Sequence, residues 1–75
     1  MVHSKPRTVH VEATVTDVLP ATGLAYLTGA DGQLWTVTKA TAGAGLQALK
    51  AGTHVNLTVT QHNRFAYVSA YAPLD

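Results

Sequence analysis

The fold is decided by a stretch that reads Thr22-Gly23-Leu24-Ala25-Tyr26-Leu27-Thr28, then Gly29-Ala30-Asp31-Gly32, then Gln33-Leu34-Trp35-Thr36-Val37-Thr38. Two short runs rich in β-branched and aromatic residues, separated by a Gly/Asp cluster, predict a β-hairpin. A single hairpin is only marginally stable in water, so the segments on either side must supply partner strands. Tyr26 and Trp35 are the largest side chains of this hairpin, and the face that they occupy therefore bears directly on function.

The flanking segments carry strand patterns of their own. Residues 9–16 alternate apolar with polar side chains, and so do residues 54–60, which predicts two strands with one buried face each. The first alternation slips at Asp17, and this predicts a β-bulge or a sharp bend near that residue. Residues 65–71 predict a further strand in which either face is suited to burial. Its tyrosines therefore either close a barrel or form a second surface patch.

The long connection at residues 39–52 contains one predicted helical turn, from Leu46 to Lys50, which ends near Gly52. Five short strands with one long loop between the third and the fourth predict an all-β fold, a five-stranded antiparallel barrel. The predicted organisation is a flexible N-terminal arm at residues 1–8 and a barrel domain at residues 9–75.

Composition excludes several classes of protein. The chain has 75 residues, which is enough for one small domain, and no cysteine, which excludes a disulfide framework and a thiolate metal site. No stretch resembles a signal peptide, and no apolar run is long enough to span a bilayer. We therefore expect a cytoplasmic protein that has no contact with a membrane.

Charge is sparse. Five basic residues stand against four acidic ones, and charged residues make up 12% of the chain. Proteins that bind nucleic acid through its phosphates usually carry a basic stripe, because neutralising phosphates releases counterions. Here that stripe is thin, and two of its members, Lys5 and Arg7, lie in the predicted arm.

Three stretches share their order and spacing with a known family of small barrels. They are Thr22-Gly23-Leu24-Ala25-Tyr26-Leu27, Leu34-Trp35-Thr36-Val37, and Gly43-Ala44-Gly45-Leu46-Gln47-Ala48-Leu49-Lys50-Ala51-Gly52-Thr53-His54-Val55-Asn56-Leu57. This pattern resembles the bacterial cold-shock domain, an OB-fold barrel that binds single-stranded nucleic acid. The third stretch is the best match, because its glycines, its leucines and its alternating strand keep the family's register without a gap. The similarity covers about residues 10–71.

The resemblance implies which residues stack on bases. Tyr26 and Trp35 match aromatic positions of the family's two motifs. Other positions of the family's binding face carry different residues in this chain, namely Asp17, Thr22, Leu24, Ala25, Val37, Thr38 and Leu46. Because stacking is worth about 1–3 kcal/mol per base, a platform that has lost most of its rings is expected to bind weakly.

Two placements of the hairpin residues are compatible with the sequence. The resemblance places Leu24, Tyr26, Trp35 and Val37 together on the outer face of the sheet, where they form an exposed apolar patch typical of an interaction site. Alternation alone places Trp35 and Val37 on the buried face, and it places Leu34 on the outer face together with two threonines. We follow the resemblance.

No enzyme or metal chemistry is predicted. The four histidines are spread along the chain without the short paired spacing of a metal site: His3, His10, His54 and His62. The acidic residues are not paired, and no Ser/His/Asp constellation or phosphate-binding loop is present. We therefore expect no catalytic residues, no cofactor and no small-molecule substrate.

Two functions remain as hypotheses. In the first, the chain is a cold-shock-like module that weakly binds single-stranded RNA or DNA by stacking on the face formed by Leu24, Tyr26, Trp35 and Val37. Lys39 and Arg64, together with Lys5 and Arg7, are its scattered phosphate contacts. In the alternative, the same apolar face docks a protein partner or forms a homodimer, without nucleic acid. We prefer the first, because the resemblance covers nearly the whole chain.

Overall fold

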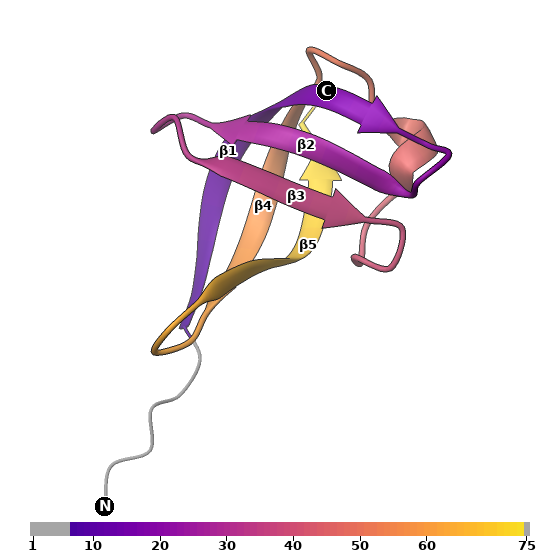
Figure 1. Cartoon of the computed structure of the whole chain (residues 1–75). Helices are drawn as coiled ribbons and strands as arrows, with labels where there is room; N and C mark the ends of the chain where they lie inside the picture. The colour runs from indigo at the N-terminus through magenta and orange to yellow at the C-terminus, as the bar shows by residue number, and fades with distance from the viewer. Residues whose placement is uncertain (1–6, 75) are drawn as a thin grey trace, which may run out of the picture.

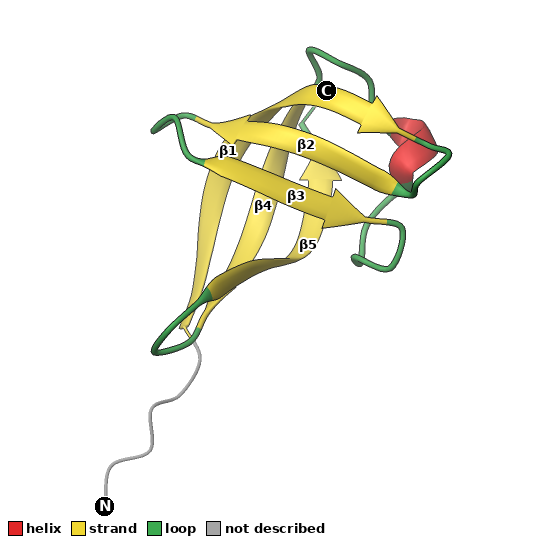
Figure 2. Ribbon diagram, viewed as in Figure 1, coloured by secondary structure: helices red, strands yellow, loops and turns green. Residues whose placement is uncertain are grey.

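The computed structural model describes residues 7–74, which form one curled sheet of five antiparallel strands (Figure 1, Figure 2). The strands are β1 (Arg7–Leu19), β2 (Leu24–Gly29), β3 (Leu34–Thr38), β4 (His54–Gln61) and β5 (Ala66–Pro73). Their order in the sheet is β3-β2-β1-β4-β5, and the curl brings β3 towards β5 to give a half-barrel. The predicted all-β class with five antiparallel strands is confirmed, and the shape is consistent with an OB-like barrel.

One short 3-10 turn, η1 (Leu46–Ala48), lies in the connection between β3 and β4, where the sequence predicts a helical turn. Within the described residues, no helix has the length and hydropathy needed to cross a bilayer. β1 begins at Arg7, so Arg7 and Thr8 belong to this strand and not to the predicted arm. The rest of that arm, residues 1–6, lies outside the described residues.

A β-bulge in β1 lets one strand serve both halves of the sheet. Val15 pairs with Leu27 and Asp17 pairs with Tyr26, so Thr16 is the extra residue, and the bulge predicted near Asp17 is confirmed. The Thr16 hydroxyl donates a hydrogen bond to the Tyr26 carbonyl oxygen at 3.0 Å, which ties the bulge to β2. Because a bulge bends its strand, residues 7–14 pair with β4 while residues 13–19 pair with β2.

A second bulge, in β5, decides which tyrosine is buried. Val59 pairs with Val68 but Thr58 pairs with Ala70, so Ser69 is the extra residue. The Ser69 hydroxyl donates to the Thr58 carbonyl oxygen at 3.1 Å and accepts from the Thr60 hydroxyl at 2.9 Å. Tyr67 and Tyr71 would share a face in a regular strand. The bulge instead directs Tyr67 outward and Tyr71 into the core.

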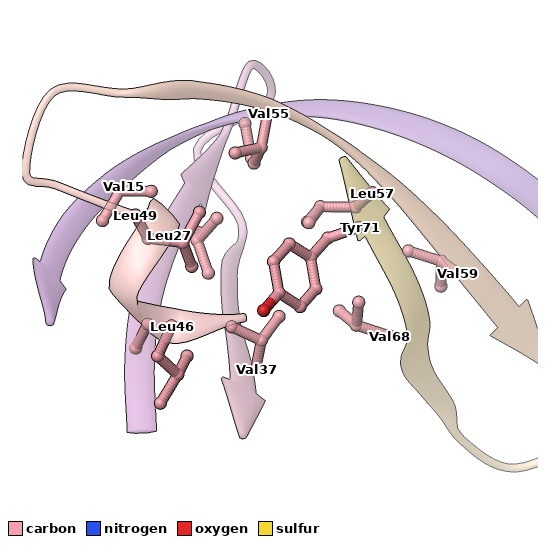
Figure 3. Close-up of a cluster of buried hydrophobic side chains, with 12 residues drawn as sticks. Val15, Leu27, Val37, Leu46, Leu49, Val55, Leu57, Val59, Val68 and Tyr71 are labelled. Carbon is pink, nitrogen blue, oxygen red and sulfur yellow. The ribbon is translucent and has the colours of Figure 1, made fainter. Parts of the chain in front are cut away.

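The core fills the concave side of the sheet (Figure 3). Twelve buried side chains form it: Ala13, Val15, Ala25, Leu27, Val37, Leu46, Leu49, Val55, Leu57, Val59, Val68 and Tyr71. Figure 3 shows the Tyr71 ring in the middle of this cluster, with its hydroxyl pointing towards the segment that carries Leu46. η1 adds Leu46, and the residue that follows it adds Leu49, so this segment closes one end of the half-barrel.

The glycines of the long connection are explained by Tyr71. The backbone N–H of Gly45 donates to the Tyr71 hydroxyl at 3.0 Å. A Cβ at Gly43 would lie 2.7 Å from the Tyr71 ring, so only glycine fits there without a shift. Gly45 has φ 101°, a conformation that residues with a side chain rarely adopt. The two glycines therefore let the loop close over one aromatic ring.

Candidate nucleic-acid interface

The pairing of β2 with β3 sets the two faces of the hairpin. Residues that pair directly across antiparallel strands lie on the same face. The inner face holds the pairs Ala25–Val37 and Leu27–Trp35, and the outer face holds Leu24–Thr38, Tyr26–Thr36 and Thr28–Leu34. The outer face thus carries one aromatic ring and an exposed leucine among threonines.

Two of the predicted interface residues are not on that face. Val37 is 0% exposed, and Trp35 is half-buried with its ring packed against the core. The placement taken from the resemblance is therefore wrong for both, and alternation alone gives the correct faces. The reason is that a register slip of one residue moves every side chain of a strand to the opposite face. The alignment of the family motif with β3 is therefore shifted by one residue, and it assigns Trp35 and Val37 to the outer face when they lie on the inner one.

The burial of Trp35 is open to direct measurement, because it is the one tryptophan in the sequence. We expect its fluorescence maximum in the native protein to lie at shorter wavelength than that of free indole in water, because the ring packs against the core. Unfolding in urea should shift the maximum to longer wavelength. A native spectrum that matches the unfolded one would contradict the inward placement of this ring.

The outer face of β2 keeps Tyr26 as its exposed ring, 39% accessible to solvent. Asp17 lies directly opposite it on β1, so a carboxylate stands beside this ring. Lys39 follows the end of β3, and its backbone N–H donates to the Gly23 carbonyl oxygen at 3.0 Å. Leu24 and Tyr26 share the outer face, whereas the Lys39 side chain lies against Gly23 and lines a hollow beside η1.

Arg64 is not part of that surface. It lies in the turn between β4 and β5, which projects away from the barrel beside the first residues of β1 (Figure 1). In the strand order, β1 and β4 separate β5 from β2. The predicted site residues Leu24, Tyr26, Trp35, Val37, Lys39 and Arg64 are thus divided among an outer face, the core, the hollow beside η1 and a distant turn.

A cluster of three aromatic rings lies at this turn and at the start of β5, and the sequence did not assign it to the site. Its members are His62, Phe65 and Tyr67. The His62 ring stacks on Phe65 with centroids 4.7 Å apart and on Tyr67 at 5.9 Å. Phe65 and Tyr67 are 59% and 46% exposed. The sequence of residues 65–71 predicts a strand in which either face is suited to burial, so it does not say which tyrosine is exposed. Only the bulge at Ser69 decides that Tyr67 faces outward.

The described surface includes the following two hollows. One, of about 560 Å³, is lined by Glu12, Thr14, Thr28, His54 and Leu74, among others. The other, of about 330 Å³, lies between the β1–β2 turn and η1 and is lined in part by Lys39 and Gln47. Within residues 7–74, no group of three or more His, Cys, Asp or Glu side chains is placed to hold a metal ion. Neither hollow therefore presents a metal-binding set among these residues.

Comparison with known proteins does not assign the chain to a family. No protein-family model matches the chain, and neither a curated protein nor a solved structure is similar to it at a significant level. The function has to be argued from the surfaces themselves.

Proposed function

We propose that this chain is a divergent cold-shock-like domain that weakly binds single-stranded RNA or DNA on the outer face of β2 and β3. The observation that supports the proposal is the exposed ring of Tyr26, 39% accessible on the outer face of β2, at a position that resembles a stacking position of that family. A base stacked on an aromatic ring is bound through its π-face, which every base has, so such binding tolerates any sequence. We propose the cytoplasm as its compartment.

The neighbours of Tyr26 explain the expected weakness. Thr28 and Thr36 place hydroxyl groups beside the ring, and hydroxyls both donate and accept hydrogen bonds with bases. Lys39 at the end of β3 offers one positive charge to a phosphate, whereas Asp17 opposite Tyr26 repels it. One ring and one lysine support binding that is weak and falls as the salt concentration rises.

The burial of Val37 favours nucleic acid over a protein partner on this face. A protein interface needs a contiguous apolar centre, and the patch considered for it consisted of Leu24, Tyr26, Trp35 and Val37. Val37 is fully buried and Trp35 packs against the core, so two of the four are turned inward. The outer face keeps Leu24, Tyr26 and the exposed Leu34, and its other residues are Thr28, Thr36 and Thr38, which suit hydrogen bonding better than hydrophobic docking.

Replacing Tyr26 with alanine tests the proposal. Since base stacking is worth about 1–3 kcal/mol, Tyr26→Ala is expected to weaken binding of a fluorescein-labelled single-stranded oligonucleotide by roughly five- to 150-fold. Fluorescence anisotropy at low salt measures this change. Tyr26→Phe keeps the ring and is expected to bind like the wild type. Equal binding by the alanine variant would overturn the proposed role of this face.

A further inference from the structure

We propose a second binding site, for bases of single-stranded nucleic acid, on the outer face of the β4–β5 hairpin. The site consists of the rings of His62, Phe65 and Tyr67, with Arg64 in the turn between them. It is separate from the face that carries Tyr26, because the turn between β4 and β5 projects away from the barrel beside the first residues of β1 (Figure 1). Each surface can therefore be tested without the other.

The three rings form one offset stack, which is called the shelf below. Their planes are inclined by 22° for His62 and Phe65, 14° for His62 and Tyr67, and 23° for Phe65 and Tyr67. The ring centroids are 4.7, 5.9 and 6.0 Å apart. Near-parallel, offset rings at such distances are favourable aromatic contacts. A flat base extends such a stack by lying against an exposed ring face.

The backbone holds the shelf in place. The His62 N–H donates to the Phe65 carbonyl oxygen at 2.8 Å and closes the turn between the two strands. Tyr67 pairs across the hairpin with Thr60, while its neighbour Val68 pairs with Val59 in the core. The rings are thus mounted on a paired hairpin, and a preorganised surface loses less conformational entropy on binding than a flexible loop does.

The core does not require these rings. Phe65 and Tyr67 are 59% and 46% exposed, so both leave much of their apolar surface in water. The buried cluster is complete without them, since Tyr71 and Val68 supply the core contacts of β5. Adjacent exposed rings on a small domain are typical of an interaction surface.

The charge around the shelf selects the partner. Arg64 lies in the turn, and Arg7 pairs with Gln61 at its base, whereas residues 7–11 and 58–70 contain no Asp or Glu. On β1 the first acidic residue is Glu12, four positions beyond Thr8, and four strand residues span about 13 Å. The Debye length is about 10 Å at 0.1 M salt, so this carboxylate is largely screened. Exposed rings in an acid-free, arginine-bearing setting complement the bases and phosphates of a single strand.

The test is the binding of fluorescein-labelled oligodeoxythymidine of about ten nucleotides, a length within the usual range for one barrel of this size. Phe65→Ala and Tyr67→Ala are each expected to weaken binding by about five-fold or more at low salt, because each removes a stacking ring. Leu74→Ala, which removes an exposed apolar side chain elsewhere, should bind like the wild type. Trp35 fluorescence reports that every variant is folded.

Charge variants provide a second readout. Affinity falls as salt rises, and Arg64→Gln is expected to make this slope of log affinity against log salt concentration shallower by about 1. Lys50→Gln, in the β3–β4 connection, should leave the slope unchanged. Wild-type binding by both ring variants, or an equal loss in Leu74→Ala, would overturn the hairpin site. The site would also be overturned if Phe65→Ala and Tyr67→Ala abolished self-association of the chain but left oligonucleotide binding unchanged.

The result for Tyr26→Ala separates the two proposals. Weak binding by that variant together with wild-type binding by Phe65→Ala and Tyr67→Ala would support the β2–β3 face and overturn the hairpin site. The reverse pattern would support the hairpin site and overturn the proposed role of Tyr26. No binding of oligodeoxythymidine by the wild-type chain at low salt would overturn both.

Discussion

Replacing Tyr71 with alanine is expected to lower the free energy of unfolding by about 3–5 kcal/mol, the range found for removal of a large buried aromatic side chain. Tyr71 is 4% exposed and lies at the centre of the core (Figure 3). It also carries the contacts that close the long loop, since its hydroxyl accepts from Gly45 at 3.0 Å and its ring lies against Gly43. Urea denaturation followed by Trp35 fluorescence measures the change.

The size of that loss matters because small domains have little stability to lose. At about 0.05–0.15 kcal/mol per residue, a chain of 75 residues is stable by roughly 4–11 kcal/mol. Tyr71→Ala is therefore expected to leave the domain marginal or unfolded at 37 °C.

Two controls separate packing from other effects. Tyr71→Phe keeps the ring but leaves the Gly45 N–H without its acceptor, which is expected to cost about 1–3 kcal/mol. Tyr67→Ala removes the same side chain four residues earlier on the same strand, at a position 46% exposed, and should cost about 1 kcal/mol or less. A loss at Tyr67 as large as that at Tyr71 would contradict the assigned faces of β5.

Deleting Ser69 is expected to be less damaging than Tyr71→Ala. Without the extra residue, β5 becomes regular, and Val68 and Tyr71 are then two positions apart, so both still face the core opposite Val59 and Leu57. The expected loss is about 1–3 kcal/mol, from the two hydrogen bonds of the Ser69 hydroxyl. Far-UV circular dichroism during thermal unfolding measures the loss.

Ser69→Ala is the matched control for the deletion, because it keeps the number of residues and therefore the bulge. It removes the hydrogen bonds to the Thr58 carbonyl and the Thr60 hydroxyl, at 3.1 and 2.9 Å. Each such bond contributes about 0.5–1.5 kcal/mol, so the substitution should cost about as much as the deletion. A loss on deletion as large as that of Tyr71→Ala would contradict the expectation that a regular β5 keeps both Val68 and Tyr71 in the core.

The glycines that give the best match to the cold-shock pattern have a structural role in this chain. Gly43 makes room for the Tyr71 ring, and Gly45 both donates to the Tyr71 hydroxyl and takes φ 101°. The loop spacing therefore reflects how the barrel is closed. It supports an expectation about fold, and the expectation about function depends instead on which rings reach the surface.

The sequence by itself determined the strands, their antiparallel arrangement and a bulge or bend near Asp17. Alternation with a period of two and glycine-bearing turns are local properties, and local properties can be read from neighbouring residues. The helical turn that begins at Leu46 and the inward set of β4 followed from the same patterns.

The tertiary structure decided which aromatic rings are exposed. It chose between the two placements of Trp35 that the sequence left open, because Trp35 pairs with the buried Leu27 and so shares its inner face. Tyr67 turned outward, and joined His62 and Phe65, because Ser69 is unpaired opposite β4. Both outcomes depend on pairing between strands, where a shift of one residue reverses the face of every side chain and leaves the local sequence pattern almost unchanged.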